Sequence, residues 1–143
     1  KSEYDERQKL IRGNGYRICF IIYLIEFGFL MFTDGMNLRL PLTSGAMYTI
    51  MLLVPICVFA VYCIVKDAFI GIRNNIKQLI VLFTVIFAAN AAGTIFQLTS
   101  GTLFVNGKLT NTCVSPALAG IFLIILISLL IKKNQYRIEE GVE

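Results

Sequence analysis

The stretch FIIYLIEFGFLMF, residues 20–32, is apolar at every position except Glu26 and Gly28. With its flank it extends from Tyr16 to Phe32, close to the roughly 20 residues that a helix needs to cross a bilayer. It therefore predicts a membrane span. Glu26 then lies roughly 12–14 Å from either end, near the bilayer centre. An ionised group at that depth costs about 3 kcal/mol, so we expect Glu26 to face protein or water rather than lipid.

Three further stretches have the same character. The predicted spans cover about residues 16–32, 46–65, 78–98 and 113–131. Of the 143 residues, 57% are hydrophobic and only 15% are charged, against about 25% charged in a soluble domain. The sequence predicts an all-α polytopic membrane protein, a single membrane domain (1–143) built as a four-transmembrane-helix bundle. Two parts lie outside the spans: residues 1–15, a short surface helix broken at Gly13 and Gly15, and the tail 132–143.

The basic residues predict the orientation. Eleven of the thirteen Lys and Arg residues flank the spans on one side, and only Arg39 and Lys108 lie on the other. Basic residues favour the cytoplasmic side, so both termini are expected there. The loop at 66–77 is expected to lie on the anionic inner leaflet. Because the positive charge follows the span ends, it indicates the lipid bilayer as a partner and no nucleic acid.

The segment TLFVNGKLTNT, residues 102–112, carries Asn106-Gly107 between two short β-prone runs. Asn-Gly favours the two-residue turn of a β-hairpin, because both positions tolerate positive φ. We therefore expect a small extracytoplasmic β-hairpin between the third and fourth helices. The loop TDGMNLRLPLTSG, residues 33–45, is expected to join it in an outer cap, with Thr43 and Ser44 as capping residues of the second span.

The third span offers Glu26 a partner. Asn90, Thr94 and Gln97 are spaced i, i+4, i+7 and share one helical face, while Tyr23 lies three residues before Glu26. One interpretation is a polar pocket, open to the outside, that binds a proton, a cation or a small polar ligand. The alternatives are a hydrogen bond between the first and third spans, which contributes about 0.6–2 kcal/mol, and a carboxylate that faces lipid or a partner.

Small residues in the third span indicate close helix packing. The pairs Ala88/Ala92 and Ala89/Gly93 have small-x-x-x-small spacing, which lets helix backbones approach. They fit packing within the bundle, or an interface in a homodimer or with a membrane protein partner. Pro55, in the middle of the second span, removes a backbone donor and fits either ordinary packing or a hinge.

The sequence lacks the groups that most enzymes use. It has no His, and its four cysteines form no C-x-x-C pair. No nucleophile–base pair, metal-ligand cluster or cofactor motif is present, so we expect no enzymatic activity, cofactor or metal. The predicted function is binding, as an accessory, sensor or immunity-type protein. The alternative is a small proton- or cation-coupled transporter that uses Glu26, for which Glu26-dependent proton flux would be diagnostic.

The segment EYDERQKLIRGNGYRICFIIYLI, residues 3–25, resembles the amino terminus of a family of small four-span bacterial membrane proteins, mostly from Firmicutes. The shared features are Asp5-Glu6-Arg7-Gln8, Arg12-Gly13 and Tyr16. The resemblance implies a multi-pass protein of the bacterial cytoplasmic (inner) membrane. It also implies a regulatory role, because the family's genes often lie near small helix-turn-helix regulators. No activity is assigned to that family, and it supplies no catalytic residues.

A weaker resemblance covers IYLIEFGFLMF, residues 22–32, which is similar to the first span of small multidrug resistance exporters. Those proteins use such a Glu for proton and cation exchange. This chain departs from them in its longer loops, its lack of Trp and its one-sided charge. The charged segment before the span alternates in sign, as in Asp5/Lys9 at i,i+4. That pattern fits either a solvated helix face or a docking segment for a cytoplasmic partner.

Overall fold

Four long helices make up most of the computed structural model, which describes residues 5–69 and 75–140. The helices are α1 (Glu6–Gly35), α2 (Ser44–Val65), α3 (Ile76–Thr99) and α4 (Val114–Glu140). Within the described part of the chain, four helices are long and apolar enough to cross a membrane, which confirms that prediction. The predicted inner-leaflet loop falls partly on residues 70–74, which lie outside the described residues.

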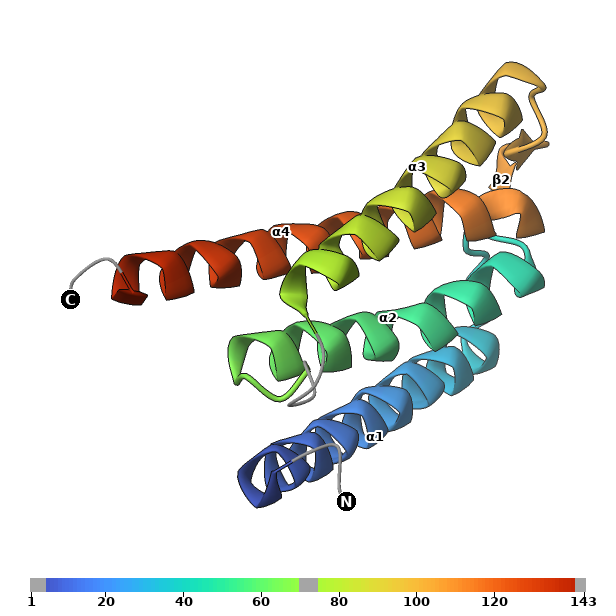
Figure 1. Cartoon of the computed structure of the whole chain (residues 1–143). Helices are drawn as coiled ribbons and strands as arrows, with labels where there is room; N and C mark the ends of the chain where they lie inside the picture. Colours follow the sequence, from blue (N-terminus) through green and yellow to red (C-terminus); the bar gives the residue numbers. More distant parts are fainter. Residues whose placement is uncertain (1–4, 70–74, 141–143) are drawn as a thin grey trace.

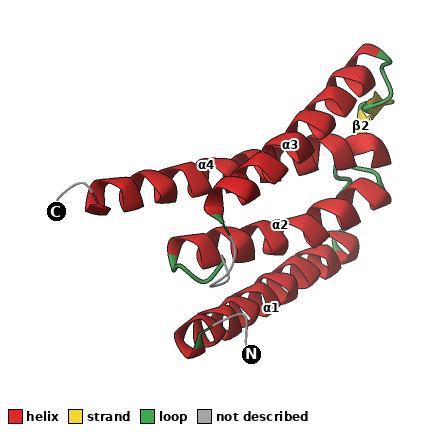
Figure 2. Cartoon of the chain, viewed as in Figure 1, coloured by secondary structure: helices red, strands yellow, loops and turns green. Residues whose placement is uncertain are grey.

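The helices run in alternating directions and pack as an open row (Figure 1). Helix α1 packs on α2, α2 packs on α4, and α4 packs on α3. Thus α2 and α4 separate α1 from α3. Along the helix axes the molecule has two ends. At one, which we call the terminal end, lie the start of α1 and the end of α4. At the other, which we call the hairpin end, lie the α1–α2 and α3–α4 connections (Figure 2).

The α3–α4 connection contains the predicted hairpin. Strands β1 (Phe104–Val105) and β2 (Lys108–Leu109) pair antiparallel, with Phe104 opposite Leu109. The turn residues Asn106 and Gly107 have φ of 51° and 72°. Two consecutive positive φ values are required in a tight type I′ turn, and Asn and Gly adopt them at least cost. The Asn-Gly signal therefore predicted the hairpin for the right physical reason.

The α1–α2 loop pairs with this hairpin. The backbone nitrogen of Thr43 donates to the Leu109 carbonyl at 2.9 Å, and the Leu109 nitrogen donates to the Pro41 carbonyl at 3.0 Å. The Thr43 hydroxyl also accepts from the Ala46 nitrogen at 3.3 Å, capping α2 as predicted. A small buried core lies beneath this pairing, formed by Ala46, Leu103 and Cys113. The two connections therefore form one structural unit.

The main apolar core lies nearer the terminal end. Ala60 and Ile64 of α2 pack there against Ile125 and Leu129 of α4, and Leu129 is fully buried. By contrast, α3 contributes no buried residue, and most large apolar side chains of α1 are exposed. Exposed apolar side chains on both outer helices are typical of surfaces that a bilayer covers.

Helix α1 is continuous, so the predicted break at Gly13 and Gly15 is wrong. The helix begins at Glu6 because Asp5 and Gln8 form a capping box: the Asp5 carboxylate accepts from the Arg7 nitrogen at 2.9 Å, and the Gln8 side chain accepts from the Asp5 nitrogen at 3.3 Å. Lys9 pairs with Glu6 at 2.6 Å rather than with Asp5. Gly15 is buried where α1 meets Phe59 of α2. It allows close approach and does not end the helix.

Replacing Gly13 or Gly15 with alanine should change the stability of the protein in opposite directions. A Cβ at Gly13 meets nothing within 4 Å, whereas one at Gly15 comes within 2.9 Å of the Phe59 ring. Gly13→Ala should stabilise the helix by about 0.5–1 kcal/mol. Gly15→Ala should destabilise the protein by about 1–3 kcal/mol, because Phe59 must move. Thermal unfolding of the two variants beside wild type tests this, and equal effects would contradict the close α1–α2 packing.

Candidate functional site

Glu26 lies on the face of α1 that packs against α2. The less exposed residues of this stretch recur every three or four positions: Gly15, Ile18, Cys19, Ile22, Glu26, Leu30 and Thr33. Two hydrogen bonds from α1 side chains to backbone carbonyls of α2 show that this face points toward α2. The Cys19 thiol donates to the Pro55 carbonyl at 3.2 Å, and the Tyr23 hydroxyl donates to the Leu52 carbonyl at 3.3 Å. Glu26 is therefore half-buried against α2 and not against α3.

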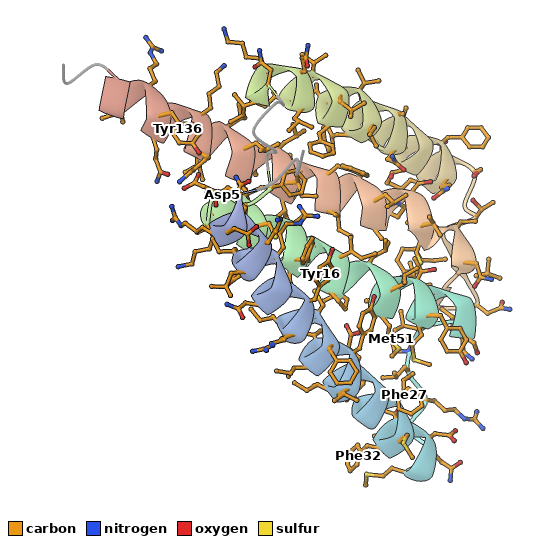
Figure 3. The ribbon with its side chains drawn as sticks, turned by 60° about the horizontal axis from the view of Figure 1, so that its bottom comes forward. Asp5, Tyr16, Phe27, Phe32, Met51 and Tyr136 are labelled. Atoms are coloured by element: carbon orange, nitrogen blue, oxygen red, sulfur yellow. The ribbon has the colours of Figure 1, made fainter. Side chains whose placement is uncertain are left out.

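A pocket of about 300 Å³ lies beside Glu26, and we call it the Glu26 pocket. Its other walls are apolar and come from α1, the α1–α2 loop and α2. The lining residues are Ile25, Phe29, Leu30, Leu40, Leu42, Met47, Ile50 and Met51. Figure 3 shows Met51 between α1 and α2. Oxygen Oε2 of Glu26 is buried and has no hydrogen-bond partner among the described residues. A buried polar atom without a partner costs about 1–3 kcal/mol, so its retention here marks a candidate site.

A second hollow adjoins the Glu26 pocket at the hairpin end. It has a volume of about 590 Å³ and is lined in part by Asp34, Arg39 and Lys108, so we call it the charged cleft. Four apolar side chains line both hollows: Leu30, Leu40, Leu42 and Met47. The two hollows are therefore neighbours across one set of side chains. Together they place a hollow with charged side chains beside one with an apolar lining.

The predicted partners of Glu26 lie elsewhere. The Asn90 amide donates to the Ile86 carbonyl at 2.8 Å, and the Thr94 hydroxyl donates to the Asn90 carbonyl at 2.8 Å. Gln97 donates to the Ser115 hydroxyl of α4 at 3.1 Å. The expected pocket formed by Glu26 with these three residues is therefore not present. Asn90, Thr94 and Gln97 do lie on one helix, but α4 and not α1 packs on that helix.

The predicted packing residues divide into two groups. A Cβ at Gly93 would lie 3.4 Å from the Ser115 hydroxyl, so this glycine lies at the α3–α4 interface. Ala88, Ala89 and Ala92 are exposed, so packing within the chain does not explain their spacing. Pro55 is fully buried, and its carbonyl accepts the Cys19 thiol. It therefore lies in the α1–α2 contact, on the same helix as the Glu26 pocket.

A polar cluster at the terminal end was not predicted. It joins α1, the segment after α2, and α4 through Gln8, Arg12, Asp67, Lys132 and Tyr136. The Asp67 carboxylate pairs with Lys132 at 2.9 Å and accepts the Tyr136 hydroxyl, while Gln8 donates to the Asp67 carbonyl at 2.8 Å. Arg12 donates to the Ala68 carbonyl at 3.4 Å. We call these contacts the Asp67 cluster.

The Asp67 cluster gives the amino-terminal motif a structural role. Gln8, Arg12 and Tyr16 are spaced i, i+4, i+8 on one face of α1. Tyr16 stacks on Phe59 with ring centroids 4.8 Å apart, and the Arg12 guanidinium lies 5.7 Å from the same ring centroid. These residues therefore hold α1 to the rest of the chain. The sequence signal for this contact is the four-residue spacing of Gln8, Arg12 and Tyr16.

The four cysteines are free thiols, and two of them, Cys63 and Cys113, are buried.

Comparison of the chain with protein-family models, curated proteins and solved structures finds no match. The chemistry of the site is that of a carboxyl group beside an apolar pocket, next to a cleft with two basic side chains and one acidic side chain. Such a site is suited to a ligand with a polar end and an apolar body.

Proposed function

We propose that the protein is a non-catalytic integral membrane protein that acts by binding an amphipathic ligand in the Glu26 pocket and the charged cleft. The observation that carries this proposal is the apolar pocket of about 300 Å³ beside a carboxyl oxygen without a partner. Pockets that bury small ligands measure about 300–1,000 Å³ and combine apolar walls with a few polar groups. A group kept unsatisfied in such a place is typical of a site that trades stability for function.

In this proposal both termini are cytoplasmic and the hairpin end faces the outside of a bacterial inner membrane. The distribution of Lys and Arg along the sequence supports this orientation, because eleven of the thirteen flank the apolar segments on the side predicted to be cytoplasmic. The charged cleft then opens outward. The resemblance of the amino terminus to small four-span bacterial proteins supports the bacterial inner membrane as the location.

Helix α1 connects the ligand site to the cytoplasmic side. It carries Glu26 in its second half and Gln8, in the Asp67 cluster, in its first turn. A ligand that shifts α1 against α2 would therefore change the contacts of Gln8. The exposed residues of this first turn, Glu6, Arg7 and Lys9, are then available to a cytoplasmic partner protein. In this proposal, transmission along α1 gives a regulatory role to a protein with few residues outside the membrane.

A small proton- or cation-coupled transporter is the second candidate. The observation that favours it is the position of Glu26 in the middle of a span, with one oxygen unpartnered among the described residues. Proteoliposomes separate the two functions. A transporter gives proton flux that disappears in Glu26→Gln, whereas a binding protein gives no flux with either chain.

Filling the Glu26 pocket tests the proposed function. Ile50→Phe adds volume inside the pocket, and Ile56→Phe is the matched control, because Ile56 is 48% exposed on the same helix. A panel of 12-carbon amphiphiles of different charge is added to the full chain, and melting temperatures are measured. A specific ligand at 100 times its Kd stabilises by about 2.7 kcal/mol. We expect at least one amphiphile to stabilise wild type and Ile56→Phe, and to lose its effect in Ile50→Phe.

If every stabilising amphiphile raises the melting temperature of all three chains to the same extent, the pocket is not the binding site. Melting temperatures without ligand show whether Ile50→Phe remains folded. Met47→Phe serves as a second pocket-filling variant, since Met47 lines both hollows.

A further inference from the structure

The charged cleft gathers the only two basic residues that the sequence assigns to the outer side. Arg39 comes from the α1–α2 loop and Lys108 from the start of β2, so segments far apart in the chain bring them together. Asp34 is the one acidic lining residue, which leaves the cleft with a net positive charge. Neither basic side chain forms an ion pair within the described residues. The cleft is therefore complementary to an anion.

The Glu26 pocket has the opposite character. Apart from Glu26, the lining side chains carry no charge, and the Glu26 Oε2 atom is itself buried. An ion in this pocket would lose its hydration with few groups to replace it. Its volume of about 300 Å³ lies at the lower end of the range for pockets that bury small ligands. The apolar lining therefore suits one alkyl chain.

Leu30, Leu40, Leu42 and Met47 line both hollows, so the two lie side by side. We propose that the occupant is a single-chain lipid with an anionic head group. Its head lies between Arg39 and Lys108, and its chain lies in the Glu26 pocket. This inference rests on the proposed function and specifies the chemistry of its ligand.

The experiment compares head groups on one chain length. Full-length protein in phosphatidylcholine nanodiscs is titrated with 12-carbon lysophosphatidylglycerol, lysophosphatidylcholine and dodecyltrimethylammonium. We expect the anionic lipid to bind about tenfold more tightly than the zwitterionic one, from two partly exposed charge pairs. Arg39→Gln/Lys108→Gln should remove this preference, and Arg39→Glu/Lys108→Glu should reverse it. The matched control, Lys133→Gln/Arg137→Gln, removes the same charge at the terminal end and should keep it.

The other outcomes separate the inference from the proposed function. Equal affinity for the anionic and zwitterionic lipids, lost in Ile50→Phe, overturns the head-group assignment and keeps the pocket. Preferred binding of the cation, lost in Glu26→Gln, also overturns it, because the charge recognised is then the Glu26 carboxylate. If none of the three binds wild type, or Ile50→Phe binds all three unchanged, the proposed function itself fails.

Discussion

Replacing Glu26 with leucine should raise the melting temperature of the purified protein. Oxygen Oε2 of Glu26 is buried without a partner among the described residues and lies beside an apolar pocket. Leucine removes an unsatisfied polar group that costs about 1–3 kcal/mol and fits the surrounding apolar walls. At about 2–4 °C per kcal/mol for a chain of this size, the increase is measurable by thermal unfolding in detergent.

The matched control is Glu26→Gln, which keeps the size and polarity of the side chain but not its charge. It should melt between wild type and Glu26→Leu. A lower melting temperature for Glu26→Leu than for wild type would show that the carboxylate contributes to packing. Glu26 would then have a structural role, and the argument that it marks a ligand site would fail.

Removing the Asp67 carboxylate should have the opposite effect. Asp67 pairs with Lys132 at 2.9 Å, accepts the Tyr136 hydroxyl, and adopts a φ of 59°. Hydrogen bonds to charged groups contribute about 1.5–3 kcal/mol, and a left-handed conformation costs alanine about 1–2 kcal/mol. Asp67→Ala should therefore destabilise the protein by about 2–4 kcal/mol, the lower values following from the 38% exposure of the Asp67 side chain.

Asp67→Asn separates the contribution of the charged contacts from that of the backbone conformation, because asparagine tolerates the left-handed conformation. Asp67→Asn should lose only the ionic part and unfold at a temperature between Asp67→Ala and wild type. Lys132→Met, alone and combined with each Asp67 variant, gives the coupling energy of the ion pair. If none of these variants changes the melting temperature, the Asp67 cluster does not hold the terminal end together.

Much of the fold could be predicted because its signals are local. Apolar runs of sufficient length gave the four helices, and Asn106-Gly107 gave the hairpin through the φ values that a tight turn requires. Gly15 shows where local reasoning fails. Glycine weakens an isolated helix, but here it permits contact with Phe59, and the packed helix continues through it.

The site was harder to predict because it depends on which helices are neighbours. The spacing of Asn90, Thr94 and Gln97 was consistent with any helix packing on that face, and the observed row places α4 there. Consecutive helices joined by short loops usually pack together, so α2 was the better choice of partner for Glu26. The Asp67 cluster combines residues 8, 12, 67, 132 and 136, and no single stretch of sequence contains its pattern.

The most direct test of the central claim is to locate a bound amphiphile by photolabelling. A 12-carbon lysolipid with a diazirine at the end of its chain is irradiated with the full-length protein in nanodiscs, and the labelled peptides are mapped by mass spectrometry. We predict adducts in residues 25–30 of α1 and 47–51 of α2, which decrease in Ile50→Phe and persist in Ile56→Phe. Adducts confined to the exposed apolar face of α3, or unchanged by Ile50→Phe, would contradict the assignment of the Glu26 pocket as the binding site.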